Sequence, residues 1–281
     1  ALGLITNIDS DHLDNYGSEA SFDDAFVAFA NGCSEKVVVS GDDPTIVRLL
    51  PRFTRPVVTF GESANVDFRV SDIQSTADGV SARISHAGEA NDLRLAVAGA
   101  HNAVNAAGAV AVLVALGVPC AEACFALADF RGTGRRFEHH GTVRGVRVYD
   151  DYAHHPREVR AALDTARSVV GAGRVIAIHQ PHLYSRTRDM ATDFAREYER
   201  GADFTVVLDV FGAREDPIPG VTGALVSDAF TDHNQVRYCP DWSEAVKVAA
   251  EHARDGDIIM TLSCGDVYRI IPSVLAELEP R

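Results

Sequence analysis

Residues that could do chemistry gather in four clusters, most of them directly after a short apolar run. The richest cluster is Tyr149 to Pro156, which holds two aspartates, two histidines and two tyrosines. In open parallel sheets, ligands bind beyond the carboxyl ends of the strands, so polar residues at strand ends are candidates for binding and catalysis. Six polar or aromatic groups in one short segment are hard to explain by core packing. We therefore interpret Tyr149 to Pro156 as part of a functional site.

The cluster from Thr6 to Asp14 combines carboxylates with His12. A neutral imidazole can ligate a divalent ion beside nucleotide phosphates, although Mg²⁺ normally prefers oxygen ligands. A solvated turn without function is the alternative interpretation of this cluster.

The cluster from Gly99 to Asn105 opens a helix rich in alanine. Asn102 and Asn105 are three residues apart and therefore share one helix face, where their amides could pair with a base or a phosphate. Asn102 is also expected to cap the helix, and capping alone is the competing interpretation. The small residues 106–108 would let this helix pack closely on a sheet.

The fourth cluster is Arg135 to Glu138, which follows two glycines. An arginine at a hinge can stabilise charge that develops on a transferring phosphoryl group, whereas a pair of loop arginines can also be merely solvated. Two further segments, Gln180 to Thr187 and Asp209 to Asp216, place Arg, His and carboxylate groups after the next two apolar runs. Three consecutive strand ends are therefore expected to be polar.

The elements that must position these clusters alternate between apolar runs and helical spacing, which predicts parallel sheets covered by helices. Between Asp67 and Val97 the pattern changes to period two, which predicts a small antiparallel meander. Asp43 before Pro44 predicts a helix start, and Pro156 should fix the first turn of another helix. The expected strands are Leu2–Asn7, Val37–Val39, Phe68–Ile73, Val80–Ser85, Leu93–Val97, Val143–Tyr149, Val175–Ile178, Phe204–Asp209, Val236–Tyr238 and Ile258–Leu262.

A domain boundary is expected at Arg131 to Arg136, where glycines and charges separate helical spacing from strand spacing. The sequence therefore predicts an α/β protein with two domains, residues 1–132 and 133–281. The first is a parallel sheet with the attached meander, and the second is a doubly wound sheet.

Composition excludes several classes of partner. With 281 residues and a net charge of −14, the chain lacks the excess of Lys and Arg that binds nucleic acid or an anionic membrane surface. Its five cysteines are odd in number and form no C-x-x-C pair, which is typical of reduced thiols. No apolar run reaches the roughly 20 residues of a membrane span, and no signal peptide opens the chain. We therefore expect a cytoplasmic protein that binds neither nucleic acid nor membrane.

Taken in order, these segments resemble the Mur ligases over nearly the whole chain. The motifs that carry the resemblance are Asp11-His12, Gly99-x-His101-Asn102-x-x-Asn105-Ala106, Arg136-Phe137-Glu138 and Asp151-Tyr152-Ala153-His154-x-Pro156. Within that family, residues 150–156 followed by 180–187 resemble the alanine-adding members.

The resemblance implies the later part of a three-domain enzyme: an incomplete parallel-sheet ATPase domain and a Rossmann-like C-terminal domain. It implies ATP and Mg²⁺ as cofactors, and UDP-N-acetylmuramate and L-alanine as substrates joined through an acyl phosphate. It also implies a role for each matching residue. These roles are Arg136, Asp151 and His154 in catalysis; His101, Asn102 and Asn105 in nucleotide binding; His155, His182 and Arg186 in substrate binding; and His12 as the metal ligand.

Two departures from the family pattern bear on activity. Leu183 stands where the family often carries a second arginine, and the phosphate-binding loop G-x-x-x-x-G-K-[ST] is absent. We therefore expect an N-terminal part of the same polypeptide to be missing and the 281-residue chain to be inactive by itself. Another Mur-type amino-acid ligase and a non-catalytic nucleotide-binding module of the same fold are the alternatives.

Overall fold

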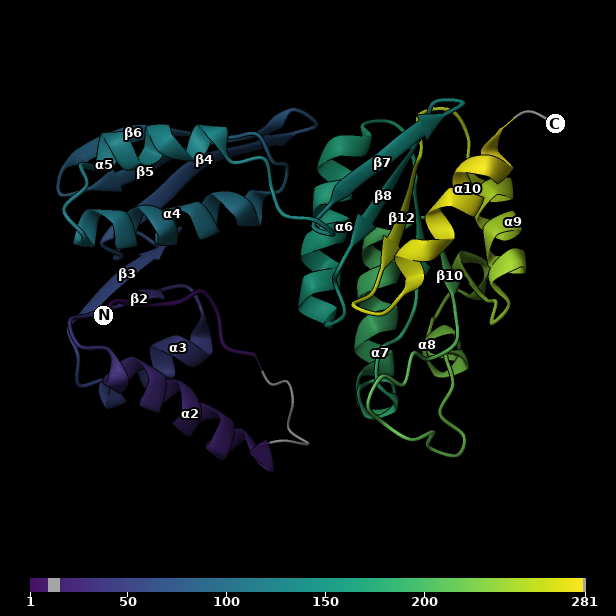
Figure 1. Ribbon diagram of the computed structural model, residues 1–281, viewed down its shortest axis with the longest axis horizontal. Helices are drawn as coiled ribbons and strands as arrows, with labels where there is room; N and C mark the ends of the chain where they lie inside the picture. The colour runs from purple at the N-terminus through teal and green to yellow at the C-terminus, as the bar shows by residue number, and fades with distance from the viewer. Residues whose placement is uncertain (10–15, 280–281) are drawn as a thin grey trace. The chain divides into compact units, whose positions relative to one another are not determined.

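The computed structural model describes residues 1–9 and 16–279. The chain forms two compact units, Ala1–Arg131 and Gly132–Arg281, which we call unit 1 and unit 2 (Figure 1).

Unit 1 contains a six-stranded sheet in the order β1-β2-β3-β4-β5-β6. The first four strands pair in parallel, and the last three form the expected antiparallel meander. One strand of this sheet, β3, was not predicted from the sequence. The strands are β1 (Gly3–Ile5), β2 (Val37–Ser40), β3 (Val57–Gly61), β4 (Phe68–Thr76), β5 (Gly79–His86) and β6 (Glu89–Leu95), and the helices are α2 (Glu19–Gly32), α3 (Pro44–Leu49), α4 (Ala100–Ala115) and α5 (Cys120–Ala126).

The small residues of α4 let this helix lie close to the sheet, as predicted. A Cβ atom added to Gly108 would lie 2.9 Å from the ring of Phe60, a separation that real Cβ contacts essentially never show. Phe60, Leu93 and Val110 are completely buried in the core between α4 and the strands. This packing fixes where the first turn of α4 lies on unit 1.

Of the two helix starts predicted in unit 1, one is confirmed and one is wrong. The side chain of Asp43 accepts a hydrogen bond from the Ile46 amide at 2.9 Å and caps α3. Helix α4 instead begins after Gly99, whose φ of 105° favours glycine. Asn102 lies inside the first turn, and its Nδ2 donates to the Ala98 carbonyl at 2.7 Å rather than capping the helix.

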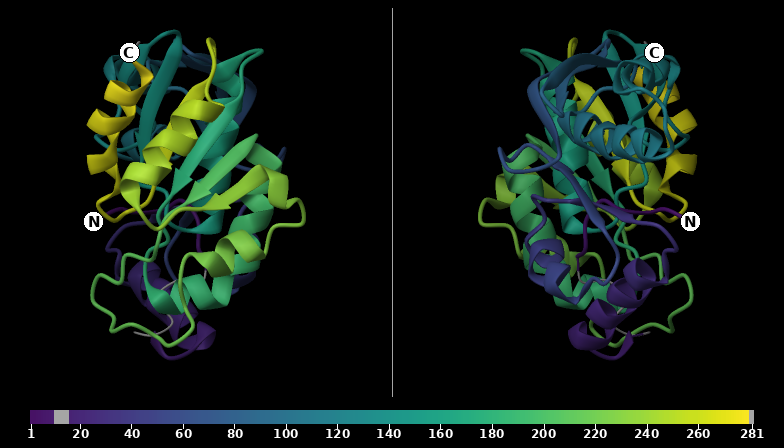
Figure 2. Two further views of the ribbon diagram at one scale, coloured as in Figure 1. Left: turned by 90° about the vertical axis from the view of Figure 1, so that its right-hand side faces the viewer. Right: turned by 90° about the vertical axis from the view of Figure 1, so that its left-hand side faces the viewer.

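Unit 2 contains a six-stranded sheet in the order β11-β10-β9-β12-β8-β7. All pairs are parallel except β7 with β8. Helices α6 and α7 cover one face of the sheet, and α9 and α10 cover the other (Figures 1 and 2). The strands are β7 (Glu138–Val143), β8 (Val146–Asp151), β9 (Val175–His179), β10 (Phe204–Val207), β11 (Val236–Tyr238) and β12 (Ile258–Leu262), and the helices are α6 (Pro156–Val170), α7 (Tyr184–Gly201), α8 (Ala224–Asp228), α9 (Trp242–His252) and α10 (Ile271–Leu278).

The predicted strand Val143–Tyr149 is wrong in its extent. The chain turns at Arg144 and Gly145, whose φ angles of 51° and 74° suit a tight two-residue hairpin. The hairpin separates β7 from β8, which pair antiparallel. Otherwise the alternation of strands and helices confirms the predicted α/β class and doubly wound sheet of unit 2.

Candidate functional site

The carboxyl ends of β8, β9, β10 and β12 bring polar side chains together at one edge of the unit 2 sheet. β12 lies between β8 and β9, with Leu262 paired to both Asp151 and His179. β8 and β9 follow one another in the sequence but lie on opposite sides of this central strand. Such a switch point is where ligands bind in open sheets. We call the side chains at these four strand ends the strand-end site.

Asp151 ends β8 and is buried. Its two carboxylate oxygens accept hydrogen bonds from the amides of Phe137 and Ala153, each at 2.8 Å. Burial raises the pKa of Asp151 to about 6, and the negative charge of Asp150 raises it further, while the two amides and the positive charge of Arg136 lower it. Asp151 can therefore gain or lose a proton near neutral pH, a property that is concentrated at functional sites.

His154 and His155 share one carboxylate partner, Glu158. Its Oε2 accepts from both backbone amides, at 3.0 and 3.2 Å, and lies 3.0 Å from Nδ1 of His154. His155 is the N-cap of α6, so the structure gives it a helix-capping role that the sequence did not predict. His154 is held with its ring 6.1 Å from that of His182.

His182 and Arg186 follow β9, with His182 just before α7 and Arg186 in its first turn. Nη1 of Arg186 is 3.3 Å from both Nδ1 and the carbonyl oxygen of His182, and the Arg186 side chain is buried. Burial, together with the positive charges of Arg186, His154 and Arg214, lowers the pKa of His182 to about 4. The structure thus presents a fixed guanidinium beside an imidazole that is neutral at pH 7, which suits a carboxylate ligand.

The loop after β10 is fastened to the segment that starts α7. The Phe211 amide donates to the Pro181 carbonyl at 2.8 Å, and the Leu183 amide donates to the Phe211 carbonyl at 3.0 Å. Glu215 accepts from the amide and the hydroxyl of Ser185. Leu183 itself is buried, so this side chain contributes packing at the position where the family often carries a second arginine.

Cys264 follows β12 in the same site, close enough to Arg186, Glu158 and Arg135 for their charges to act on it. Burial raises the pKa of Cys264 to about 11. The side chain is therefore a thiol at neutral pH, which excludes a nucleophilic thiolate there.

A buried histidine ends β9 directly before the strand-end site. His179 is completely buried, and its Nδ1 lies 2.7 Å from the hydroxyl of Tyr198 on α7. Burial lowers the pKa of His179 to about 3, against a hydrogen bond with the Leu262 backbone that raises it. This neutral pair joins α7 to β9.

The nucleotide-binding residues predicted in unit 1 lie together on the first turns of α4. His101 and Asn105 are exposed, and Asn102 is half-buried. They share one end of a helix, as predicted, and the amide of Asn102 is fixed there by its hydrogen bond to the Ala98 carbonyl. His12, the predicted metal ligand, lies outside the described residues.

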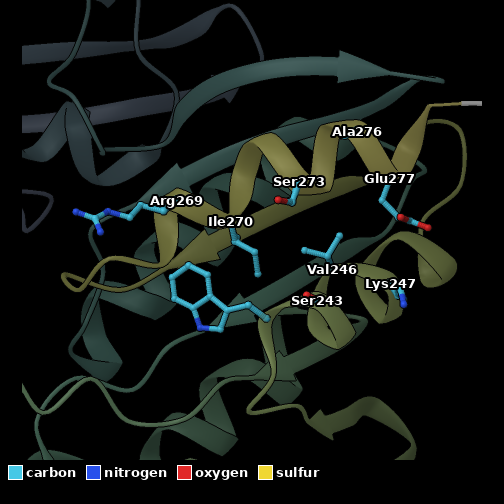
Figure 3. Close-up of a pocket in the computed structure, with 9 residues that line it drawn as sticks. Ser243, Val246, Lys247, Arg269, Ile270, Ser273, Ala276 and Glu277 are labelled. Atoms are coloured by element: carbon cyan, nitrogen blue, oxygen red, sulfur yellow. The ribbon is translucent and has the colours of Figure 1, made fainter.

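One pocket lies outside the strand-end site. A pocket of about 370 Å³ opens between α9 and α10, lined by Trp242, Lys247, Arg269 and Ser273 among others (Figure 3). It contains none of the residues predicted to act in catalysis or binding.

Within residues 1–9 and 16–279, no three His, Cys, Asp or Glu side chains form a metal-binding group, and no helix could span a membrane.

Sequence reasoning missed the partners that hold the site together. Glu158 carried a readable signal, since a carboxylate three residues after an N-cap is typical of a capping box. Arg135 carried none, because its partners Asp150, Ser263 and Gly265 are 15 to 130 residues away in the sequence.

Comparison with protein families and known proteins agrees with this geometry. Residues 1–113 match the Mur ligase middle domain, and residues 135–265 match the Mur ligase glutamate ligase domain. A protein from Clavibacter michiganensis subsp. michiganensis named UDP-N-acetylmuramate–L-alanine ligase is 64% identical over 280 residues, which are 99% of this chain and 58% of that protein. A protein of the same name from Thermobifida fusca is 41% identical over 291 residues, covering 99% of this chain and 61% of that protein.

Among solved structures, the UDP-N-acetylmuramate–alanine ligase from Thermotoga maritima is 26% identical, with a TM-score of 0.77 over 98% of this chain and 59% of that one. The chain thus spans about three fifths of the length of the relatives it resembles. Because the two family models together match residues 1–113 and 135–265, the chain belongs to the Mur ligase family and carries its middle and glutamate ligase domains.

Proposed function

We propose that this chain supplies the middle and amino-acid-binding domains of an ATP-dependent ligase that joins L-alanine to UDP-N-acetylmuramate. The observation that carries the proposal is buried Arg186 beside neutral His182 at the end of β9. The names of the Clavibacter and Thermobifida relatives support the same substrates.

The proposed reaction has two steps. ATP transfers its γ-phosphoryl group to the carboxylate of UDP-N-acetylmuramate, giving ADP and an acyl phosphate. The neutral amine of alanine then attacks the acyl carbon, and inorganic phosphate leaves as the amide forms. Because alanine is mainly an ammonium ion at pH 7, its nitrogen must lose a proton before the attack.

Small size decides how alanine must be recognised. Its methyl group offers little apolar burial, so the ammonium and carboxylate groups must supply most of the binding. Arg186 is the proposed carboxylate partner, since its planar fork can donate two parallel hydrogen bonds. His154, His155 and His182 would shape the remainder of the pocket.

The other predicted roles stay proposals. Arg136 would stabilise charge on the transferring phosphoryl group, and Asp151 would exchange a proton near it. His101, Asn102 and Asn105 would contact the nucleotide. Mg²⁺ with His12 as a ligand would neutralise phosphate charge when bound.

A cytoplasmic location is part of the proposal. ATP is a cytoplasmic substrate, and all five cysteines are free, as expected in a reducing compartment.

The experiment uses a fusion of this chain to the part of the Clavibacter michiganensis relative that precedes the matched region, which we call the test ligase. We expect it to release phosphate only when UDP-N-acetylmuramate and L-alanine are both present. The 281-residue chain alone should release none above background, because it lacks the loop that cradles the ATP phosphates.

The alternatives appear as distinct results. A test ligase that prefers another amino acid over alanine would indicate a different Mur-type ligase. A test ligase that binds ATP but forms no amide bond with any amino acid would leave only a nucleotide-binding module.

A further inference from the structure

The two neighbouring arginines of the fourth sequence cluster have different environments. Nε of Arg135 donates to Oδ2 of the completely buried Asp150 at 2.8 Å, while Nη2 and Nη1 donate to the carbonyls of Ser263 at 2.7 Å and Gly265 at 3.1 Å. The Arg135 side chain is 23% exposed, against 50% for Arg136. The guanidinium of Arg135 is thus used within the fold, and only Arg136 presents half of its side chain to solvent.

Tyrosine rings add to the fastening of Arg135. Its guanidinium carbon lies 5.0 Å from the ring centre of Tyr152 and 4.6 Å from that of Tyr268. Both distances are within the range of cation–π attraction. Arg135 therefore joins the end of β8, the loop after β12 and the short helical turn Val267–Ile270 that precedes α10.

The backbone around Arg136 adopts conformations that side chains normally avoid. Arg135 and Phe137 have φ angles of 59° and 48°, in the left-handed region. Such residues cost free energy and persist only where surrounding contacts hold them. Here the Arg135 amide donates to Glu138 and its carbonyl accepts from the Tyr152 amide, both at 2.7 Å.

Phe137 is held from the other side of Arg136. Its amide donates to Asp151 at 2.8 Å, and its ring stacks on Tyr149 with ring centres 4.3 Å apart. Arg136 is therefore set between two strained residues that are both fastened to β8.

The direction of Arg136 follows from this arrangement. Its guanidinium lies 3.8 Å from the Glu158 carboxylate and 5.4 Å from the ring centre of Tyr152. A change of the backbone angles at Arg135 or Phe137 would turn the Arg136 side chain away from these two neighbours.

We propose that Arg135 is a positioning residue: by clamping residues 135–138 to β8 and to the loop after β12, it fixes the direction in which Arg136 meets the transferring phosphoryl group. The inference rests on the ligase function proposed above. Of the two neighbouring arginines, Arg135 holds the segment in place and Arg136 acts on the phosphoryl group.

Arg135→Lys in the test ligase is the principal test. Lysine keeps the charge but cannot donate to Asp150 and both carbonyls with one planar group. We expect kcat to fall about tenfold or more with KM for alanine changed less than about twofold, because small displacements of a catalytic group chiefly affect the chemical step. An unchanged kcat would overturn the proposal.

Arg174→Lys is the matched control. Arg174 also bonds a buried aspartate, Asp257, and the backbone carbonyl of His252, but it precedes β9 at the opposite edge of the sheet. Arg174→Lys should lower stability as Arg135→Lys does, while leaving kcat unchanged. Equal losses of kcat in the two variants would show a general effect of destabilisation and would contradict positioning.

A double-mutant cycle tests whether Arg135 acts through its neighbour. In an Arg136→Ala background, Arg135→Lys should change kcat by less than about twofold, because the residue being positioned is gone. Additive losses would refute the inference. If Arg135→Lys does not fold, Asp150→Asn removes the anchoring charge with little change of shape, and the same non-additivity is expected.

Amide hydrogen exchange in the 281-residue chain separates this proposal from the proposed function. Arg135→Lys should raise the exchange rates of the Tyr152 and Phe137 amides by about tenfold or more, since local opening becomes easier. Unchanged rates would disprove the clamp whether or not the test ligase makes amide bonds. An unmutated test ligase without activity would instead refute only the proposed function.

Discussion

The buried pair of His179 and Tyr198 makes the stability of unit 2 depend on pH in a direction that can be worked out. The pKa of His179 is lowered from 6.5 to about 3 in the fold by burial, so the folded chain keeps it neutral in mild acid. In mild acid the unfolded chain therefore binds a proton at this histidine that the folded chain does not bind. Stability is therefore complete above pH 6.5 and falls as the pH drops from there towards 3.

The size of the effect follows from the two pKa values. At about pH 5, the unfolded histidine is almost fully protonated and the folded one is not, which corresponds to ~2 kcal/mol of lost unfolding free energy. Other groups titrate in the same range, including His182 and Asp151. The prediction is therefore a difference between the wild type and His179→Gln, which has no charge to gain at this position.

Urea denaturation followed by tryptophan fluorescence is the assay. The chain has a single tryptophan, Trp242 on α9, so fluorescence reports unit 2 without interference from unit 1. Between about pH 7.5 and about pH 5, the wild type should lose ~2 kcal/mol more than His179→Gln. Equal losses in the two proteins would mean that His179 can be protonated in the fold, and the reasoning from its burial would be wrong.

Three further variants test contacts described above. Tyr198→Phe leaves Nδ1 of His179 buried without its 2.7 Å partner, and it should lower the unfolding free energy of unit 2 by ~1–3 kcal/mol in the same assay. An unchanged midpoint and slope would contradict this. In the test ligase, Arg136→Ala should lower kcat by about a hundredfold while changing ATP affinity much less, because the charge it stabilises develops only during transfer. An unaltered kcat in steady-state kinetics would mean that Arg136 is merely a solvated loop residue. Arg186→Lys should raise the alanine KM by about tenfold with far smaller changes for ATP and the UDP-sugar. A rise in the UDP-sugar KM instead would move Arg186 to the sugar site.

The sequence predicted the α/β class and most strands because apolar runs and turn residues act locally. Ile258–Leu262 was predicted with its correct ends, and Asp43 was recognised as a helix cap from its own neighbours. The error at Val143–Tyr149 arose because an apolar run and a hairpin turn overlap there. The turn is visible only in the left-handed angles of Arg144 and Gly145.

The candidate site was predictable in part for a similar reason. His182 and Arg186 lie only four residues apart on one segment, so the sequence alone indicates that they are neighbours. The clamp on Arg135 depends on three partners from β8 and the loop after β12, and no local pattern encodes that meeting. The neutral state of His182 likewise depends on burial and on charges that come from three segments.

The place of β12 in the sheet governs when unit 2 can complete its fold during synthesis. Residues 258–262 are made after β8, β9, β10 and β11, yet they occupy the gap between β8 and β9. Until they arrive, no strand joins Asp151 to His179, and closing so long a loop is slow compared with local pairing. The residues of the strand-end site that follow β8, β9 and β10 are therefore made before the sheet can close around them. A chain truncated before Ile258 would keep those side chains but could not bring them together.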